Sequence, residues 1–255
     1  MSEIYSTVNQ KGGVGKTTTA VNLAAYLATF GKNVLLVDMD SQGNATVGVG
    51  VDRDKLEKCV YDVLIEGMPV AEAVIPTSIS GLSLLPSTVR LAGAEVELVP
   101  ENFRETRLKK ALEEVRPDYN FIIIDCPPSL SLLTVNALVA SDEVIIPIQC
   151  EYYALEGLSQ LTNTIDLIRG SLNPTLKLKG ILLTMYDGRT LLSEQVCEEV
   201  RKHFGRKVFK TVVPRNVRLA ESPSFGQPIL FYDPSSSGAA AYEGLARELL
   251  DGHHS

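Results

Sequence analysis

Seven short apolar segments recur along the chain, at intervals that leave room for a helix between most of them. They are near-continuous hydrophobic runs, as is typical of parallel strands covered by helices on both faces. The predicted strands are Ile4–Val8, Asn33–Asp38, Leu82–Pro86, Asn120–Asp125, Glu143–Ile148, Leu178–Met185 and Lys207–Val213.

Segments with helical periodicity alternate with these strands. They are Lys16–Phe30, Arg104–Val115, Leu130–Ala140, Leu155–Arg169, Leu191–Phe204 and Ser237–Leu250. This alternation predicts a doubly wound α/β fold, with a mostly parallel sheet and helices on both faces. Pro86–Glu101 is the least regular stretch, where we expect a surface loop. No repeat or linker interrupts the pattern, so a single domain over residues 1–255 is the simplest organisation, with its end frayed from residue 250 to 255.

Composition agrees with one globular domain. A chain of 255 residues with 45% hydrophobic residues can bury a full core. No apolar run approaches the roughly 20 residues of a membrane-spanning helix, and the first ten residues lack the basic-then-apolar pattern of a secretory signal. We therefore expect a cytosolic protein.

The four cysteines stand far apart in the sequence and form no CxxC pair: Cys59, Cys126, Cys150 and Cys197. None of the three histidines has ligand spacing with them. We expect the cysteines to be small buried hydrophobic residues, and neither a disulfide framework nor a zinc site.

Charge is distributed unevenly along the chain. The net charge is −7, which argues against binding a polyanion through overall charge. One stretch, however, holds seven basic residues and no acidic one: Arg201, Lys202, Arg206, Lys207, Lys210, Arg215 and Arg218. The rest of the chain has 17 basic and 31 acidic residues, a net charge of −14. Such a contrast is compatible with a face for polyanions and equally with a solvated helix and strand edge.

A glycine-rich turn lies between the first predicted strand and the first predicted helix. Its residues are Lys11, Gly12, Gly13, Val14, Gly15, Lys16, Thr17 and Thr18. Glycines let successive N–H groups point at phosphate oxygens, and the following helix presents its positive dipole end to the same anion. The turn therefore predicts a nucleotide site in which Lys16 contacts the β- and γ-phosphates and the Thr17 hydroxyl ligates Mg²⁺.

The turn departs from the general phosphate-loop pattern at one position. Gln10 replaces the first glycine, and Lys11 is an added lysine. This signature, KGGxGKT, resembles the deviant Walker A motif of the ParA/Soj/MinD group of P-loop ATPases. The resemblance implies that Lys11 crosses a dimer interface to the partner's nucleotide, which would couple dimerisation to ATP. A phosphate contact within its own subunit is the alternative.

The second strand ends in two carboxylates, Asp38 and Asp40. The resemblance implies that Asp40 lies in the first switch region, where it orients or deprotonates the attacking water and belongs to the metal site with Thr17 and Asp125. A carboxylate is sufficient there because phosphoryl transfer depends on positioning more than on a strong base. Asp38 is expected to be structural or an indirect partner of magnesium.

A single carboxylate, Asp125, ends the apolar run Phe121–Ile124. This is the Walker B pattern, which holds Mg²⁺ directly or through water. Two prolines follow and define a stiff loop that resembles the second switch.

Two later strand ends bear on the choice of base. The resemblance implies that Pro214 and Asn216 contact adenine. The guanine-reading motif NKxD is absent, since the corresponding stretch reads TMYD. We therefore predict ATP as the cofactor, with Mg²⁺.

The resemblance covers nearly the whole chain and is nearest to the chromosomal ParA (Soj) branch. It implies an ATP-bound homodimer that binds double-stranded DNA without sequence preference through Arg189 and Arg218, on the nucleoid. It also implies a ParB-like partner whose basic segment stimulates slow hydrolysis and so releases the DNA.

Three alternatives remain open at this point. A MinD-like membrane-surface ATPase of cell-division positioning shares every nucleotide motif, but needs a basic amphipathic helix after Tyr242, where the charges are balanced. A metabolic or cluster-assembly enzyme, such as a relative of the nitrogenase iron protein or of a biotin-pathway synthetase, has only Cys126 as a candidate cluster ligand. A DNA-binding module without catalysis does not explain Lys16, Asp40 and Asp125.

Overall fold

The computed structural model describes residues 2–151 and 154–252. Tyr152, Tyr153 and residues 253–255 lie outside the described residues. Of the end for which fraying was expected, residues 250–255, Leu250 is the last residue of a helix. No helix in the described ranges is long and apolar enough to cross a bilayer.

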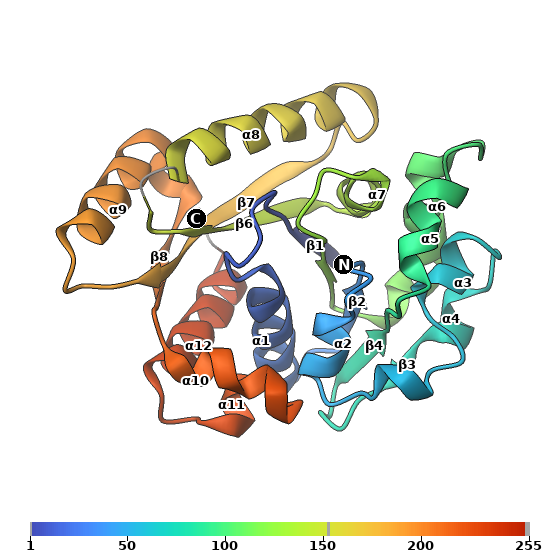
Figure 1. Cartoon of the computed structure of the whole chain (residues 1–255), viewed down its shortest axis with the longest axis horizontal. Coiled ribbons are helices and arrows are strands. Elements are labelled where there is room, and N and C mark those ends of the chain that lie inside the picture. The colour runs from blue at the N-terminus through green and yellow to red at the C-terminus, as the bar shows by residue number, and fades with distance from the viewer. Residues whose placement is uncertain (1, 152–153, 253–255) are drawn as a thin grey trace.

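A mostly parallel sheet forms the centre of the molecule, in the order β3–β4–β2–β5–β1–β6–β7–β8 (Figure 1). The strands are β1 (Glu3–Thr7), β2 (Val34–Asp38), β3 (Ile75–Pro76), β4 (Leu82–Leu85), β5 (Phe121–Asp125), β6 (Glu143–Gln149), β7 (Lys177–Tyr186) and β8 (Val208–Pro214). Only the pairing of β3 with β4 is antiparallel within the described residues. The predicted fold class is confirmed, and the two-residue edge strand β3 is added to it.

The predicted helices cover both faces of the sheet. They are α1 (Lys16–Thr29), α6 (Arg107–Val115), α7 (Leu132–Ala140), α8 (Ala154–Ser171), α9 (Leu191–Phe204) and α12 (Ser237–Leu250). Figure 1 shows α7 and α8 on one side of the sheet and α1 and α12 on the other.

Strand β5 shows why the predicted strands are apolar throughout. Ile122 and Ile124 pack into the core that includes residues of α6, α7 and α8, whereas Phe121 and Ile123 pack into the core with α1 and α12. Both sides of the strand are buried, so every position favours an apolar side chain.

Short helices between these elements were not predicted. They are α2 (Asn44–Gly48), α3 (Val60–Leu64), α4 (Val70–Ala73), α5 (Leu91–Glu97), α10 (Val217–Glu221) and α11 (Ile229–Tyr232). Single 3₁₀ turns lie at Arg53–Lys55, Arg104–Thr106, Arg116–Asp118, Gly205–Lys207 and Ser222–Phe225.

The prediction of a surface loop at Pro86–Glu101 was wrong in part, because α5 lies within it. Leu91, Ala94 and Leu98 are fully buried, and their spacing places them on one helical face. A helix of seven residues is too short for its periodicity to stand out in the sequence.

Candidate functional site

The carboxyl ends of three adjacent strands define the candidate site. In the parallel register of the sheet, Asp125 at the end of β5 stands opposite both Thr7 of β1 and Asp38 of β2. The glycine-rich turn follows β1, so the same register places it beside these carboxylates. Ligands of open α/β sheets bind at this edge.

The glycine-rich turn needs glycine at two positions for its backbone conformation. Gly13 and Gly15 have φ angles of 74° and 91°, in the left-handed region that other residues seldom adopt. Helix α1 starts directly afterwards at Lys16, so its first N–H groups point into the turn. Thr184 of β7 stabilises the turn, because its hydroxyl donates to the Val14 carbonyl oxygen at 2.8 Å.

Lys16 is buried in its own subunit. Only 6% of the residue is exposed, and its Nζ donates to the carbonyl oxygen of Lys11 at 3.0 Å. Burial lowers the pKa of Lys16, while the nearby carboxylates of Asp125 and Asp40 act in the opposite direction. The ammonium group therefore lies where an added polyanion would stabilise its charge.

Asp125 is fully buried and has an unused oxygen. Thr7 Oγ1 lies 3.3 Å from its Oδ1, and the nearby Thr17 side chain acts to lower the pKa of Asp125. Its buried Oδ2 has no hydrogen-bond partner among the described residues. Burial, followed by the charge of Asp38, raises the pKa of Asp125 well above its usual value. A bound cation would supply the missing partner and favour the ionised form.

The donor set at Asp125 fits magnesium. Carboxylate and hydroxyl oxygens are ligands that Mg²⁺ prefers, and at phosphate sites it takes few of them from the protein. Within residues 2–151 and 154–252, no three histidine, cysteine or acidic side chains converge to form a complete cage. Thr17 and Asp125 could therefore hold the ion together with phosphate oxygens and water.

Asp38 and Asp40 lie in different environments. Asp38 is fully buried; its Oδ1 accepts from the Asp40 amide at 3.1 Å, and its Oδ2 accepts from the Thr46 amide and hydroxyl at 2.8 and 2.7 Å. Burial raises the pKa of Asp38 to about 6, although these hydrogen bonds act to lower it. Asp38 thus attaches α2 to the end of β2, which is the structural arrangement that the sequence suggested.

Asp40 opens onto a surface cleft, although only 8% of the residue is exposed. Its Oδ1 accepts from the Gln42 amide at 2.9 Å. The cleft, of about 300 Å³, is lined by Asp40, Ser41 and Gln42, by Pro127, Pro128 and Ser129, by Leu133, and by Ala92 and Glu95 of α5. Both predicted switch segments therefore meet beside the carboxylate proposed to position water.

Lys11 points away from the buried pocket that holds Lys16. Its side chain is 57% exposed, and its Nζ lies 2.6 Å from Oε2 of Glu151, just beyond β6. Asn9 supports this part of the turn, since its Oδ1 accepts from the Lys11 amide at 3.0 Å. The two lysines of the turn are thus separated into one buried and one surface position.

Comparisons with known proteins identify the family of this chain. The model of a family described as "AAA domain" matches residues 2–178. The sporulation initiation inhibitor protein Soj of Bacillus subtilis is 59% identical over 249 residues, 98% of either chain. The chromosome partitioning protein ParA of Myxococcus xanthus is 57% identical over 242 residues, 95% of this chain and 86% of that protein.

The chain belongs to the ParA/Soj family of P-loop ATPases. Among solved structures, the cobyrinic acid a,c-diamide synthase from Mycobacterium smegmatis, with bound ADP and magnesium, is 40% identical with a TM-score of 0.86. The match covers 98% of this chain and 94% of that chain. The resemblance inferred from the deviant phosphate loop is therefore confirmed, and the chain is an ATPase.

The residues predicted to contact adenine lie at the end of β8. Pro214 ends the strand opposite Tyr186 of β7, and the Arg215 amide donates to the Tyr186 carbonyl oxygen at 2.9 Å. Asn216 is the N-cap of α10, because its Oδ1 accepts from the Arg218 amide at 2.8 Å. The adenine contacts of both residues remain a prediction.

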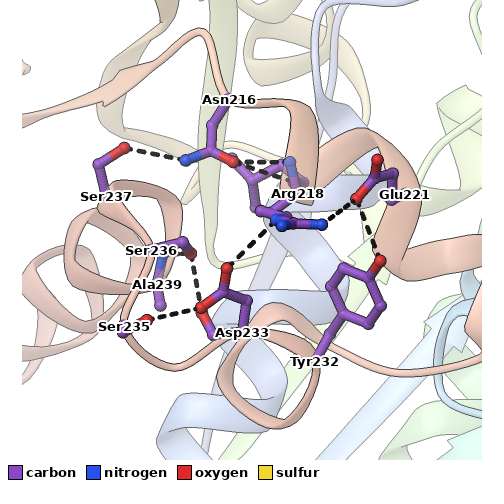
Figure 2. A network of polar contacts seen from close by, with 10 residues as sticks. Asn216, Arg218, Glu221, Tyr232, Asp233, Ser235, Ser236, Ser237 and Ala239 are labelled. Carbon is purple, nitrogen blue, oxygen red and sulfur yellow. Dashed lines mark hydrogen bonds and ion pairs between the residues drawn. The ribbon is translucent and has the colours of Figure 1, made fainter.

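The two arginines predicted to contact DNA are both ion-paired. Figure 2 shows the side chain of Arg218 between Glu221 and Asp233, at 3.0 and 3.4 Å. Arg189 donates to both carboxylate oxygens of Asp187, at 2.8 and 2.7 Å. Both arginines are exposed, so a phosphate could reach them, but it would compete with these carboxylates.

The structure divides the basic stretch into different surroundings. Arg201, Arg206 and Lys210 line a cleft of about 760 Å³ with Arg247 of α12. Arg218 instead belongs to the network of Figure 2. The seven basic residues, which are consecutive basic positions in the sequence, therefore do not share one site in the structure.

Residues that sequence reasoning missed stabilise the site from outside the motifs. Thr184 holds the glycine-rich turn, Thr46 holds Asp38, and Glu151 pairs with Lys11. Thr184 begins the TMYD stretch and Glu151 follows the predicted strand Glu143–Ile148, but no spacing in the sequence links either residue to the turn.

Cys126 bears on the iron–sulfur alternative. It is fully buried, and burial together with the adjacent Asp125 raises the pKa of its thiol well above the ordinary value. Its surroundings therefore disfavour the thiolate that a cluster ligand must provide.

Proposed function

We propose that this chain is a Mg-ATP-dependent chromosome-partitioning ATPase that binds double-stranded DNA as a nucleotide-bound homodimer. The names of its relatives, Soj and chromosome partitioning protein ParA, support the biological role. The ADP and magnesium bound in the Mycobacterium smegmatis structure support the cofactors. Identity is higher to Soj, at 59%, than to that protein, at 40%, which favours partitioning over amide synthesis.

The division of labour between two lysines is the observation that carries the proposal. Lys16 is buried near Asp125 and Asp40 of its own subunit, whereas Lys11 is at the surface with 57% of its side chain exposed. A surface lysine such as Lys11 is suited to reach a nucleotide held by another subunit. Dimerisation would then complete each site with a second cation.

Within each subunit, the other residues take distinct roles. Lys16 and the N-terminal amides of α1 would bind the phosphates, and Thr17 and Asp125 would hold the magnesium ion. That ion, when bound, neutralises charge on the phosphates. Asp40, at the edge of its cleft, would orient the attacking water. Pro214 and Asn216 would contact adenine.

DNA binding is assigned to Arg189 and Arg218, on the nucleoid, with a ParB-like protein as the partner that stimulates hydrolysis. Contacts to phosphates give affinity without sequence preference, and two subunits double them. The structure of α12 favours DNA over a membrane surface, because Tyr242, Leu245 and Leu249 are buried in the core and are not available to lipid.

A mixing experiment tests the dimer at the level of single residues. Lys11→Ala and Asp40→Ala should each be inactive alone. Mixed with ATP, they should regain about a quarter of wild-type ATPase activity, because half of random dimers are mixed and each has one complete site. Lys11→Ala mixed with a Lys11→Ala/Asp40→Ala chain is the matched control and should stay inactive. No recovery in the first mixture would show that Lys11 acts within its own subunit.

DNA binding needs a separate measurement. Duplex DNA retention should be compared with ATP, with ADP and without nucleotide, across a salt series. The proposal predicts retention with ATP that weakens steeply as salt rises. Equal retention in all three nucleotide states would contradict it.

A further inference from the structure

Two cysteines that are distant in the sequence meet in the fold. The sulfur atoms of Cys150 and Cys197 lie 3.5 Å apart. Cys150 immediately follows β6 and is buried, whereas Cys197 lies in the middle of α9 and is partly exposed. The remaining two cysteines, Cys59 and Cys126, are fully buried.

We propose that Cys150 and Cys197 form a thiol–disulfide site that is oxidised by low-molecular-weight disulfides. A disulfide has a sulfur–sulfur bond of about 2.05 Å, so the two sulfurs need to approach by roughly 1.5 Å. The partly exposed Cys197 gives a reagent access to one thiol. This goes beyond ATP hydrolysis, because neither cysteine belongs to the nucleotide site.

The two thiols are chemically unequal, which assigns them different steps. The hydrogen bond with Cys150 lowers the pKa of Cys197, burial acts in the opposite direction, and the positive charge of Arg201 lowers it again. Arg201 lies four residues further along α9, one helical turn away. The same hydrogen bond, together with burial, raises the pKa of Cys150. Cys197 is also the more exposed of the two, so it is the attacking thiol, and the buried Cys150 is the resolving one.

The reaction balances in two exchange steps. The Cys197 thiolate attacks one sulfur of the reagent RSSR, which forms a mixed disulfide and releases RS⁻. Cys150 then loses its proton to solvent and attacks the Cys197 sulfur, which releases a second RS⁻. The two departing thiolates take up the two protons. In total, two cysteine thiols and one RSSR give one internal disulfide and two RSH.

The position of the pair connects it to elements around the nucleotide site. The amide of Cys150 donates to the carbonyl oxygen of Thr184, whose hydroxyl holds Val14 of the glycine-rich turn. Cys150 also directly precedes Glu151, the partner of Lys11. A disulfide would tie α9 to this strand end.

Oxidised glutathione is the probe that tests the site. Reduced full-length protein is incubated with it, quenched, denatured and titrated with a thiol reagent. Two of the four cysteines should lose their thiols, and peptide mapping should identify the Cys150–Cys197 bond. Addition of dithiothreitol should restore all four thiols. Four free thiols after the incubation, or a bond between another pair, would overturn the proposal.

Single substitutions separate the two roles. Cys150→Ser should stop at a stable mixed disulfide on Cys197, with a mass increase of one glutathione, and Cys197→Ser should leave Cys150 unmodified. Cys59→Ser is the matched control and should oxidise like the wild type. Modification of Cys150 in the Cys197→Ser chain at the wild-type rate would refute the assigned order. Since the wild-type mapping stands alone, a variant that fails to fold leaves the proposal testable.

Discussion

The Nζ of Lys11 lies 2.6 Å from Oε2 of Glu151 within a single chain. Both side chains are about half exposed, at 57% and 44%. Ion pairs at such positions contribute only about 0–1 kcal/mol. A nucleoside triphosphate carries more negative charge than one carboxylate, so in the proposed dimer the partner's nucleotide would replace Glu151. The isolated subunit thus holds its second lysine in a contact that is easily exchanged.

Glu151→Gln should lower the protein concentration needed for ATP-dependent dimerisation by up to about 30-fold, because each of the two Lys11 side chains of the dimer no longer leaves an ion pair worth about 0–1 kcal/mol. Sedimentation of the ATP-bound protein over a concentration series measures this. Glu72→Gln, which removes the exposed partner of Lys58, is the control for the change in charge. Dimerisation as weak as that of the wild type would show that Glu151 does not compete for Lys11.

Lys16→Ala should abolish ATP binding, because the loop loses the buried cation that faces the phosphates. Calorimetric titration with ATP and magnesium measures this directly. Lys58→Ala removes a surface lysine and should bind ATP normally. Wild-type affinity in Lys16→Ala would refute the assignment of the phosphate site.

Asp40→Ala should bind ATP but hydrolyse it at least about 100-fold more slowly, because the water loses its positioning carboxylate. The protein should therefore accumulate as a dimer with ATP, which size-exclusion chromatography detects. Ser41→Ala, from the same cleft, should hydrolyse ATP at a nearly normal rate. A monomeric Asp40→Ala protein in the presence of ATP would contradict the scheme.

Arg218→Glu should keep ATP hydrolysis but lose DNA retention at low salt, since it places a third carboxylate beside Glu221 and Asp233. Gel shifts with duplex DNA and ATP measure the loss. Arg169→Glu makes the same charge change next to Asp166 on α8 and is the matched control. Equal loss in both variants would indicate that only net charge matters.

The buried Asp38 should make the stability of the magnesium-free protein depend on pH. Its pKa is about 6 in the folded chain, against 3.8 as the ordinary value. Between these values the folded state binds more protons than the unfolded state. The contribution of Asp38 to the free energy of unfolding therefore falls as pH rises from about 4 to 6 and is constant above that. Relative to Asp38→Asn, the wild type should lose on the order of 3 kcal/mol over this interval. Urea unfolding of both proteins at pH 4.5 and 7 checks the sign. A wild type that gains stability relative to Asp38→Asn as pH rises would contradict the raised pKa.

Local patterns predicted the sheet and the loop because each is encoded in consecutive residues. The run from Phe121 to Asp125 shows a buried strand and its terminal carboxylate without reference to the rest of the chain. In the turn from Lys11 to Lys16, the glycines likewise indicate a backbone conformation that can bind phosphate.

Contacts between distant segments could not be predicted in this way. Glu151 meets Lys11, and Cys197 meets Cys150, only because β6 lies next to β1 and α9 packs near the end of β6. Helix α5 was missed for another reason, since its two buried residues, Leu91 and Ala94, give too little periodicity to distinguish it from a loop.

The facing positions of Thr7, Asp38 and Asp125 have a consequence for synthesis on the ribosome. A nascent chain that has emerged only as far as α5 already contains the glycine-rich turn, but the strand carrying Asp125, which pairs with both β1 and β2, has yet to appear. Such a chain lacks Asp125, the carboxylate that stands opposite Thr7 of β1 in the native register. A chain released early would therefore carry the signature of an ATPase and lack a place for the metal.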